Sequence, residues 1–147
     1  MSRMTREWDI RNNAAWSFET ERFFVGFYAE DEELDPADSF DFQEDIDAVH
    51  YGEVEWFCAH VGVFLKSDNA CDWREIGSDY LGACAYRTVR EFYTNWRTDP
   101  DESRNTLANK DKGISICHYF PDMVRSAIRE ARLELKRMGA VAKDIHA

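Results

Sequence analysis

Cysteine and histidine are the residue types in this chain that could bind a metal. Cys58 and His60 would share one face of a strand, Cys84 would lie on a neighbouring strand, and Cys117 with His118 forms a further donor pair. Zinc sites usually take ligands from tight pairs such as Cys-x2-Cys, which are absent here. Free cysteine is also among the most buried residue types. We therefore expect core cysteines, with no metal and no cofactor.

The same residues raise the question of thiol catalysis. A nucleophilic Cys58 or Cys84, activated by His60 or His118, would need a partly exposed thiol with a low pKa. The apolar neighbours of both cysteines favour the reverse. A zinc- or thiol-dependent enzyme is therefore only our second alternative. We assign no catalytic residue and expect a protein that is not an enzyme.

Carboxylates are the other chemical group that stands out. The 147-residue chain has a net charge of -11, and residues 23–65 hold twelve acidic residues without a single Lys or Arg. The rest of the chain has 17 acidic and 18 basic residues and is nearly neutral. The twelve acidic residues are Glu30, Asp31, Glu32, Glu33, Asp35, Asp38, Asp41, Glu44, Asp45, Asp47, Glu53 and Glu55.

This charge pattern argues against direct binding to nucleic acid or to an anionic membrane, because phosphate contacts need clustered Lys and Arg. Carboxylates along a helix and its flanking loop can instead approach the charge spacing of duplex DNA. The partner expected is a basic host nucleic-acid-binding protein or complex. The candidate partner-binding residues are Glu30, Asp31, Glu32, Glu33, Asp35, Asp38, Asp41, Glu44, Asp45 and Asp47.

Two other interpretations of the acidic residues stay open. They could serve solubility, with some of them paired to a basic stripe on the last helix that consists of Arg125, Arg129, Arg132 and Lys136. Calcium binding is disfavoured, because the chain has no Asp-x-Asp-x-Asp-Gly loop with a Glu at the twelfth position.

The sequence predicts that the central acidic residues lie on a helix. Asp41 to Glu44 has the form of a capping box, and Gly52 would end the helix. Phe42, Ile46 and Val49 would form its apolar face, which leaves Glu44, Asp45 and Asp47 pointing to solvent.

The remaining elements follow from apolar periodicity. Strands are predicted over Phe23 to Ala29, Val54 to Leu65 and Tyr80 to Tyr86, with Lys66 to Ser78 as a long hairpin connection and a bulge or close approach at Gly82. Ile114 to Tyr119 is a candidate edge strand. Helices are predicted near Ile10, over Thr88 to Trp96, and after Pro121, the last with an apolar face of Val124, Ile128, Ala131, Leu135 and Met138.

Together these elements predict an α+β fold, a small antiparallel sheet of three to four strands with two to three helices packed mainly on one face. The length fits one domain over residues 1–147, with residues 1–20 as a poorly defined extension and residues 98–113 as a mobile connector. The chain has no apolar run of 18 or more residues and no signal-peptide pattern, so we expect a cytoplasmic protein without a membrane segment.

Three blocks of sequence resemble a family of small acidic proteins from bacteriophages and prophages. They are Glu55 to Cys58, Asp79 to Tyr86, and Tyr119 to Met123 with Ala127 after it. The resemblance covers roughly residues 21–90 and 118–135. It implies a phage or mobile-element origin and the host bacterial cytoplasm as the location, and it brings no catalytic residues.

The resulting hypothesis is a phage-encoded, non-enzymatic inhibitor of a host defence system that acts on nucleic acid. Its acidic surface would occupy a basic nucleic-acid-binding site, as a DNA mimic does. The first alternative is a phage structural or assembly accessory protein that binds another virion or host protein. Whether the protein is a monomer or a homodimer stays open.

Overall fold

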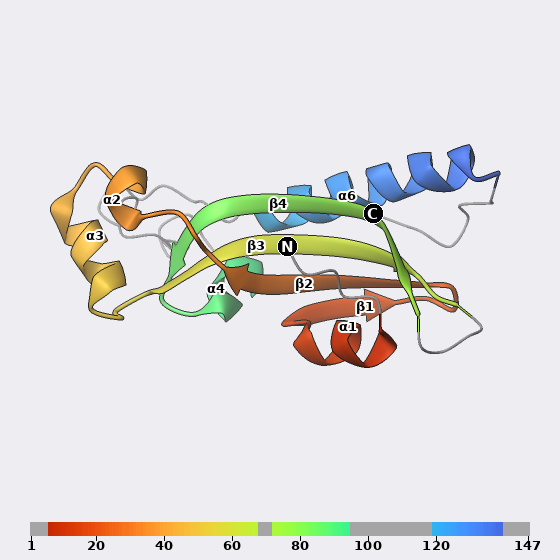
Figure 1. Ribbon diagram of the computed structural model, residues 1–147, viewed down its shortest axis with the longest axis horizontal. Helices are drawn as coiled ribbons and strands as arrows, with labels where there is room; N and C mark the ends of the chain where they lie inside the picture. Colours follow the sequence, from red (N-terminus) through yellow and green to blue (C-terminus); the bar gives the residue numbers. More distant parts are fainter. Residues whose placement is uncertain (1–5, 68–71, 95–118, 140–147) are drawn as a thin grey trace. The chain divides into compact units, whose positions relative to one another are not determined.

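The computed structural model describes residues 6–67, 72–94 and 119–139. Within these residues, four strands form one antiparallel sheet in the order β1-β2-β3-β4, and five helices accompany it (Figure 1). The predicted α+β class is confirmed. In chain order the elements are α1 (Glu7–Asn13), β1 (Trp16–Glu19), β2 (Phe23–Asp31), α2 (Pro36–Ser39), α3 (Gln43–His50), β3 (Glu55–Leu65), β4 (Arg74–Tyr86), α4 (Val89–Thr94) and α6 (Tyr119–Arg137).

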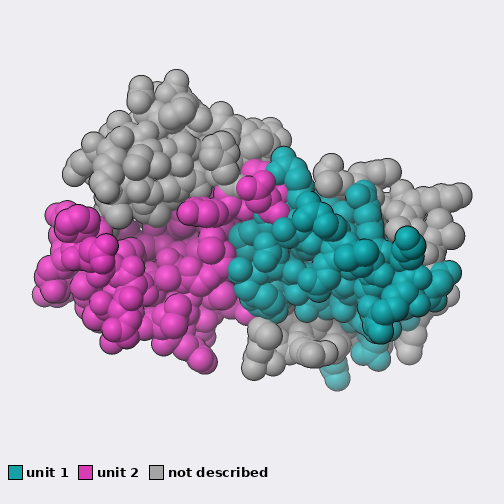
Figure 2. Space-filling model, turned by 90° about the horizontal axis from the view of Figure 1, so that it is seen from above, with its two compact units in different colours: residues 1–28, 60–80, 123–147 teal, residues 29–59, 81–122 magenta. Residues whose placement is uncertain are grey.

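The chain divides into two compact units (Figure 2). Unit 1 consists of residues 1–28, 60–80 and 123–147, and unit 2 of residues 29–59 and 81–122. The three longest strands each contribute residues to both units, whereas α2, α3 and α4 belong to unit 2 alone. The two units are described separately below.

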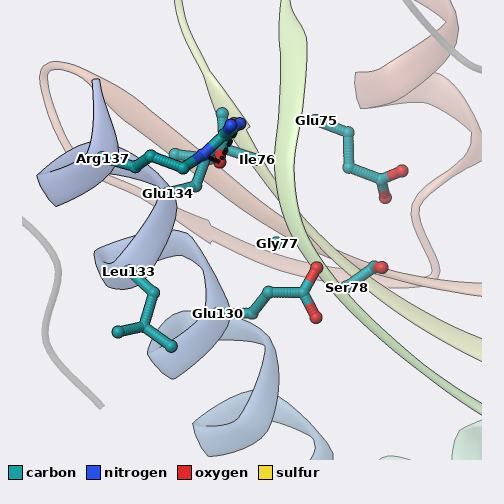
Figure 3. A pocket seen from close by; sticks show the side chains of 8 residues that line it. All are labelled: Glu75, Ile76, Gly77, Ser78, Glu130, Leu133, Glu134 and Arg137. Carbon is teal, nitrogen blue, oxygen red and sulfur yellow. Dashed lines mark hydrogen bonds and ion pairs between the residues drawn. The ribbon is translucent and has the colours of Figure 1, made fainter.

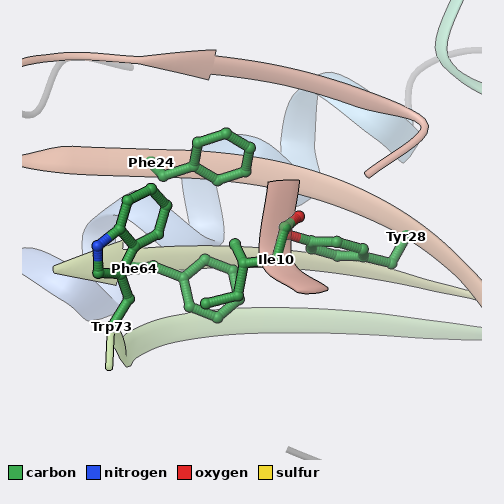
Figure 4. Close-up of a cluster of buried hydrophobic side chains, with 5 residues drawn as sticks. All are labelled: Ile10, Phe24, Tyr28, Phe64 and Trp73. Carbon is green, nitrogen blue, oxygen red and sulfur yellow. The ribbon is translucent and has the colours of Figure 1, made fainter. Parts of the chain in front are cut away.

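In unit 1, the sheet is apolar on both faces. β1 pairs antiparallel with β2, with Trp16 opposite Phe27 and Phe18 opposite Val25. On one face Ile10 of α1 packs in a buried cluster with Phe24, Tyr28, Phe64 and Trp73, and the Tyr28 hydroxyl donates a hydrogen bond to the Ile10 carbonyl at 2.9 Å (Figure 4). This contact makes residues 7–19 part of the folded unit, although their sequence did not predict β1.

Helix α6 covers the opposite face of the unit 1 sheet from α1 (Figures 1 and 4). Its backbone comes so close to β4 that a Cβ built at Gly77 would lie 2.2 Å from the Ala127 carbonyl oxygen. Glycine at this position therefore permits the helix to lie directly on the strand. The sequence had led us to expect helices mainly on one face, whereas here each face has one helix.

The predicted apolar face of α6 is largely found. Ile128, Ala131 and Leu135 are fully buried, Val124 is half-buried, and Met138 is 42 % exposed. Pro121 lies in the first turn, as predicted, but the helix already begins at Tyr119. Tyr119 is thus helical and not the end of an edge strand; the rest of the expected strand, residues 114–118, and the expected connector, residues 98–113, lie outside the described residues.

Strand β4 begins at Arg74, six residues earlier than Tyr80, so the expected connection from Lys66 to Ser78 is shorter than predicted. The added strand residues gain partners across the sheet. Nε2 of the buried His60 lies 2.7 Å from Oε2 of Glu75, and the His60 ring stacks on Tyr80 with centroids 4.3 Å apart. The polar residues here had led us to predict a hairpin connection. The contacts that make them part of a strand come from distant residues and leave no pattern in the local sequence.

Unit 2 has an aromatic core. The Phe92 ring of α4 packs edge-on against Phe57 of β3 and Tyr86 of β4, with centroids 5.8 and 5.1 Å away. A second buried cluster contains Ala48, Val54 and Ala85, with Phe40, Val49 and Trp56 partly buried against it. This smaller cluster is the one on which α3 rests.

The start and the orientation of α3 differ from the prediction. The N-cap residue is Phe42, no side chain caps the helix, and the predicted capping box of Asp41 and Glu44 is therefore wrong. Asp45 and Ala48 are its buried residues, whereas Phe42 is 53 % exposed. The helix is turned so that Ala48 meets Val54 and Ala85, and a small residue suits that narrow space better than Phe42 would.

Candidate protein-binding surface

The acidic residues of the chain are concentrated in unit 2. Its described residues include 14 acidic residues and two arginines, a net charge of -12. The described residues of unit 1 include nine acidic and ten basic residues, a net charge of +1. The structure thus assigns nearly all of the charge imbalance to one compact unit. We call the acidic exposed residues of positions 30–55 the acidic surface.

The ten predicted partner-binding residues differ widely in exposure. Six are exposed, three are half-buried and one is buried. The exposed residues are Asp31, Glu33, Asp35, Asp38, Asp41 and Glu44; the half-buried ones are Glu30, Glu32 and Asp47; the buried one is Asp45. The exposed set is therefore the part of the prediction that a partner could contact without rearrangement.

The side chains of Glu32 and Asp35 accept hydrogen bonds from backbone amides of unit 2. The Glu32 carboxylate accepts hydrogen bonds from the amides of Leu34 at 3.0 Å and Ala83 at 2.7 Å. Ala83 has a positive φ of 57°, a backbone conformation that alanine rarely adopts. The hydrogen bond that the Ala83 amide donates to Glu32 stabilises this conformation. Asp35 is the N-cap of α2 and accepts from the Ala37 amide at 2.9 Å. The close approach expected at Gly82 is also found, because a Cβ there would lie 3.1 Å from the Glu32 carboxylate.

Two further carboxylates of the acidic segment bind within unit 2. Asp47 accepts a hydrogen bond from the side-chain amide of Gln43 at 2.9 Å, one helical turn away. Glu55 accepts from the Val89 amide at 2.6 Å and thereby binds the first turn of α4. These bonds fix the scaffold and leave fewer carboxylates for a partner than the sequence suggested.

Asp45 contradicts the prediction most clearly. It was expected to point to solvent, but only 1 % of it is exposed and neither carboxylate oxygen has a hydrogen-bond partner. Burial raises the pKa of the Asp45 carboxyl above its ordinary range, and the nearby Glu44 raises it further. Its burial follows from the orientation of α3 that places Ala48 in the small cluster.

Three large apolar side chains in the same segment, residues 30–55, are also exposed, and sequence reasoning missed them. Leu34 and Phe42 are each 53 % exposed and Tyr51 is 79 % exposed. Phe42 and Tyr51 are the two cap residues of α3, so their backbones are about 13 Å apart along the helix. Aromatic anchors surrounded by polar groups are typical of protein-protein interfaces. Phe42 was missed because its spacing to Ile46 fitted an apolar face.

The two thiols among the described residues, Cys58 and Cys84, are poorly suited to catalysis. Cys84 is buried, and burial raises the pKa of its thiol to about 12. Burial also raises the pKa of the half-buried Cys58, with a smaller contribution from the nearby Glu32 and Glu30. His60 is engaged by Glu75 and Tyr80. The further donor pair that was considered for zinc, Cys117 and His118, lies outside the described residues.

Open hollows are present in the described part of unit 1. A groove of about 400 Å³ lies between β4 and α6 and is lined by Glu75 to Ser78, Glu130, Leu133, Glu134 and Arg137 (Figure 3). Glu134 in this groove binds Arg137 at 2.7 Å and Arg74 at 3.3 Å, and the Arg137 contact lowers its pKa. Glu134 and Arg137 in this groove therefore pair with each other, and Glu75 is engaged by His60.

The second hollow, of about 800 Å³, borders Trp73. The Arg11 guanidinium and the Lys66 ammonium lie 4.9 and 5.7 Å from the centre of the Trp73 ring. The Glu19 carboxylate bridges these two cations, and the hydrogen bond from Arg11 lowers its pKa. Arg11 and Lys66 are thus both paired with a carboxylate of the same unit.

Comparisons with known proteins give no family for this chain. No family model matches it, and searches of curated proteins and of solved structures find no match either. In the described part of the chain, no helix is both long and apolar enough to cross a membrane. Among the same residues, no group of three or more His, Cys, Asp or Glu side chains is placed to hold a metal ion.

Proposed function

We propose that this chain is a non-enzymatic binding protein whose acidic surface occupies the basic nucleic-acid-binding site of a host protein. The observation that supports this most strongly is the separation of charge, with -12 in the described part of unit 2 and +1 in that of unit 1. Solubility depends on the net charge of the whole protein and gives no reason for confining the charge to one unit. A single acidic unit suits a localised basic partner.

The composition of the acidic surface supports a protein as the partner. Exposed carboxylates at Asp38, Asp41 and Glu44 would attract a basic surface over a distance, which raises the association rate. The exposed rings of Phe42 and Tyr51 would then provide the apolar contacts that charge alone does not. The resemblance to phage proteins favours a nucleic-acid-acting host defence protein as the target, with DNA mimicry as the mode of inhibition.

The test is a pull-down from host lysate at low salt with the full chain as bait, followed by mass spectrometry. We expect a basic nucleic-acid-binding protein to be captured, and to be released both by salt and by added duplex DNA. A bait in which Asp38→Asn, Asp41→Asn and Glu44→Gln are combined should lose the protein. All three side chains are exposed, so this variant should remain folded.

The matched control is a bait with Glu21→Gln, Asp72→Asn and Glu130→Gln, which removes three exposed charges from unit 1 instead. It has the same net charge as the first variant and should capture the protein as the parent does. Equal losses in both variants would show that only total charge matters. Capture of a virion protein instead would favour the structural or assembly alternative.

A further inference from the structure

Helix α3 holds a group that surface charge alone does not account for. Asp45 is 99 % buried, since only 1 % of it is exposed, and both of its carboxylate oxygens lack a hydrogen-bond partner. Buried carboxylates in folded proteins are normally paired with a cation or hydrogen-bonded. The nearby charged side chain that affects its pKa is Glu44, which has the same sign. Asp45 is therefore a buried acceptor that has no hydrogen-bond partner and no counter-charge among the described residues of unit 2.

The surroundings of Asp45 indicate which counter-charge would fit. Both oxygens lack a hydrogen-bond partner, and a planar guanidinium can donate to both at once, whereas an ammonium acts as a point charge. The exposed rings of Phe42 and Tyr51 stand at the two ends of α3, and guanidinium groups stack well on such rings. The exposed carboxylate of Glu44 lies next to it in the same turn and would draw a cation toward the helix.

We propose that Asp45, which is buried in the helix that carries Glu44 of the acidic surface, determines the specificity of binding and receives an arginine side chain of the partner protein. This inference rests on the proposed function and names the chemistry of recognition. Nucleic-acid-binding sites use arginine to hold phosphates, and the Asp45 carboxylate takes the place of such a phosphate. Since Asp45 is buried in the free protein, the arginine enters as α3 shifts at its amino end, where no side chain caps it.

The experiment compares two synthetic peptides of equal length and charge, one of arginine and one of lysine, titrated into the full-length protein by calorimetry. We expect the arginine peptide to bind about tenfold more tightly. Asp45→Asn should bring the two affinities within about twofold, because the amide cannot pair with a guanidinium through two acceptor oxygens. The control Glu44→Gln removes one exposed charge from the same turn; it should weaken both peptides alike and keep the preference.

A preference for arginine that survives Asp45→Asn, or its absence in the parent, would overturn the inference. If neither peptide binds in a salt-dependent manner, the proposed function itself fails, which is a different result. A measurement on the unaltered protein guards against misfolding of the variant: the carboxyl ¹³C resonance of Asp45 should move on addition of the arginine peptide and stay in place with the lysine peptide. An Asp45 resonance that moves equally with both peptides would also contradict the inference.

Discussion

At the scale of single residues, Asp45 makes its own contribution to how stability depends on pH. Burial raises the pKa of its carboxyl in the folded protein above the value of about 4 that an unfolded chain has. The folded protein therefore binds more protons than the unfolded one between these two pKa values. Consequently the free energy of unfolding decreases as pH rises through this window and does not recover above it.

The variant Asp45→Asn should abolish that decrease. At pH 7 we expect it to be more stable than the parent by about 1 to 2 kcal/mol, because a buried amide loses less hydration energy than an unpaired carboxylate. Well below pH 4 the two proteins should be equally stable, since the carboxyl is then neutral in both states. Thermal melting of both proteins across this pH range measures the difference; a parent that is more stable than Asp45→Asn at pH 7 would show that Asp45 is paired.

Cys84 should be an inert thiol in the folded protein. Its thiol pKa of about 12 leaves only on the order of one thiolate in ten thousand at pH 8. Iodoacetamide should therefore modify Cys84 very slowly until urea unfolds the chain, and Cys58, which is half-buried, should react sooner. Peptide mapping by mass spectrometry separates the four cysteines. Modification of native Cys84 at the rate of an unfolded thiol would contradict its burial.

At the scale of elements, α6 should dock through the buried face that contains Ile128 and Leu135. Both side chains are fully buried, so Ile128→Ala or Leu135→Ala would each leave a cavity and lower the free energy of unfolding by about 2 to 5 kcal/mol. Leu133→Ala is the matched control on the same helix, because Leu133 is 64 % exposed and its loss should change stability by less than about 0.5 kcal/mol. Urea unfolding measures the free energy of unfolding of all three variants. Similar losses for Leu133→Ala and Leu135→Ala would contradict the docking of α6 through this face.

Helices α6 and α3 show that the length of a helix decides how well its buried face can be predicted from sequence. Over the 19 residues of α6, an apolar stripe repeats often enough to define one face. The eight residues of α3 complete only about two turns. An apolar face with Phe42, Ile46 and Val49 therefore fitted the sequence as well as an orientation that buries Ala48. The contact of Ala48 with Val54 and Ala85 stabilises the second orientation, in which Asp45 is buried and Phe42 is exposed.

At the scale of the whole molecule, the charge in unit 2 should make stability depend on salt. Like charges in one compact unit repel one another, and salt screens this repulsion with a Debye length that falls from about 14 Å at 50 mM to about 4 Å at 500 mM. The melting temperature should therefore rise over this range. The variant with Asp38→Asn, Asp41→Asn and Glu44→Gln should show a smaller rise than the matched unit 1 variant, and equal rises would contradict a localised repulsion.

The sequence by itself determined where the charge lies, since residues 29–59 contain no Lys or Arg, and it predicted the α+β class, the cores of β2 and β3, and most of the α6 face. These features depend on composition and on periodicity over many residues. Only the tertiary structure decided that β4 begins at Arg74, that Asp45 is buried and that Phe42 and Tyr51 are exposed. The physical reason is that a short segment satisfies several local patterns equally well, and the contacts that choose among them come from residues far away in the sequence.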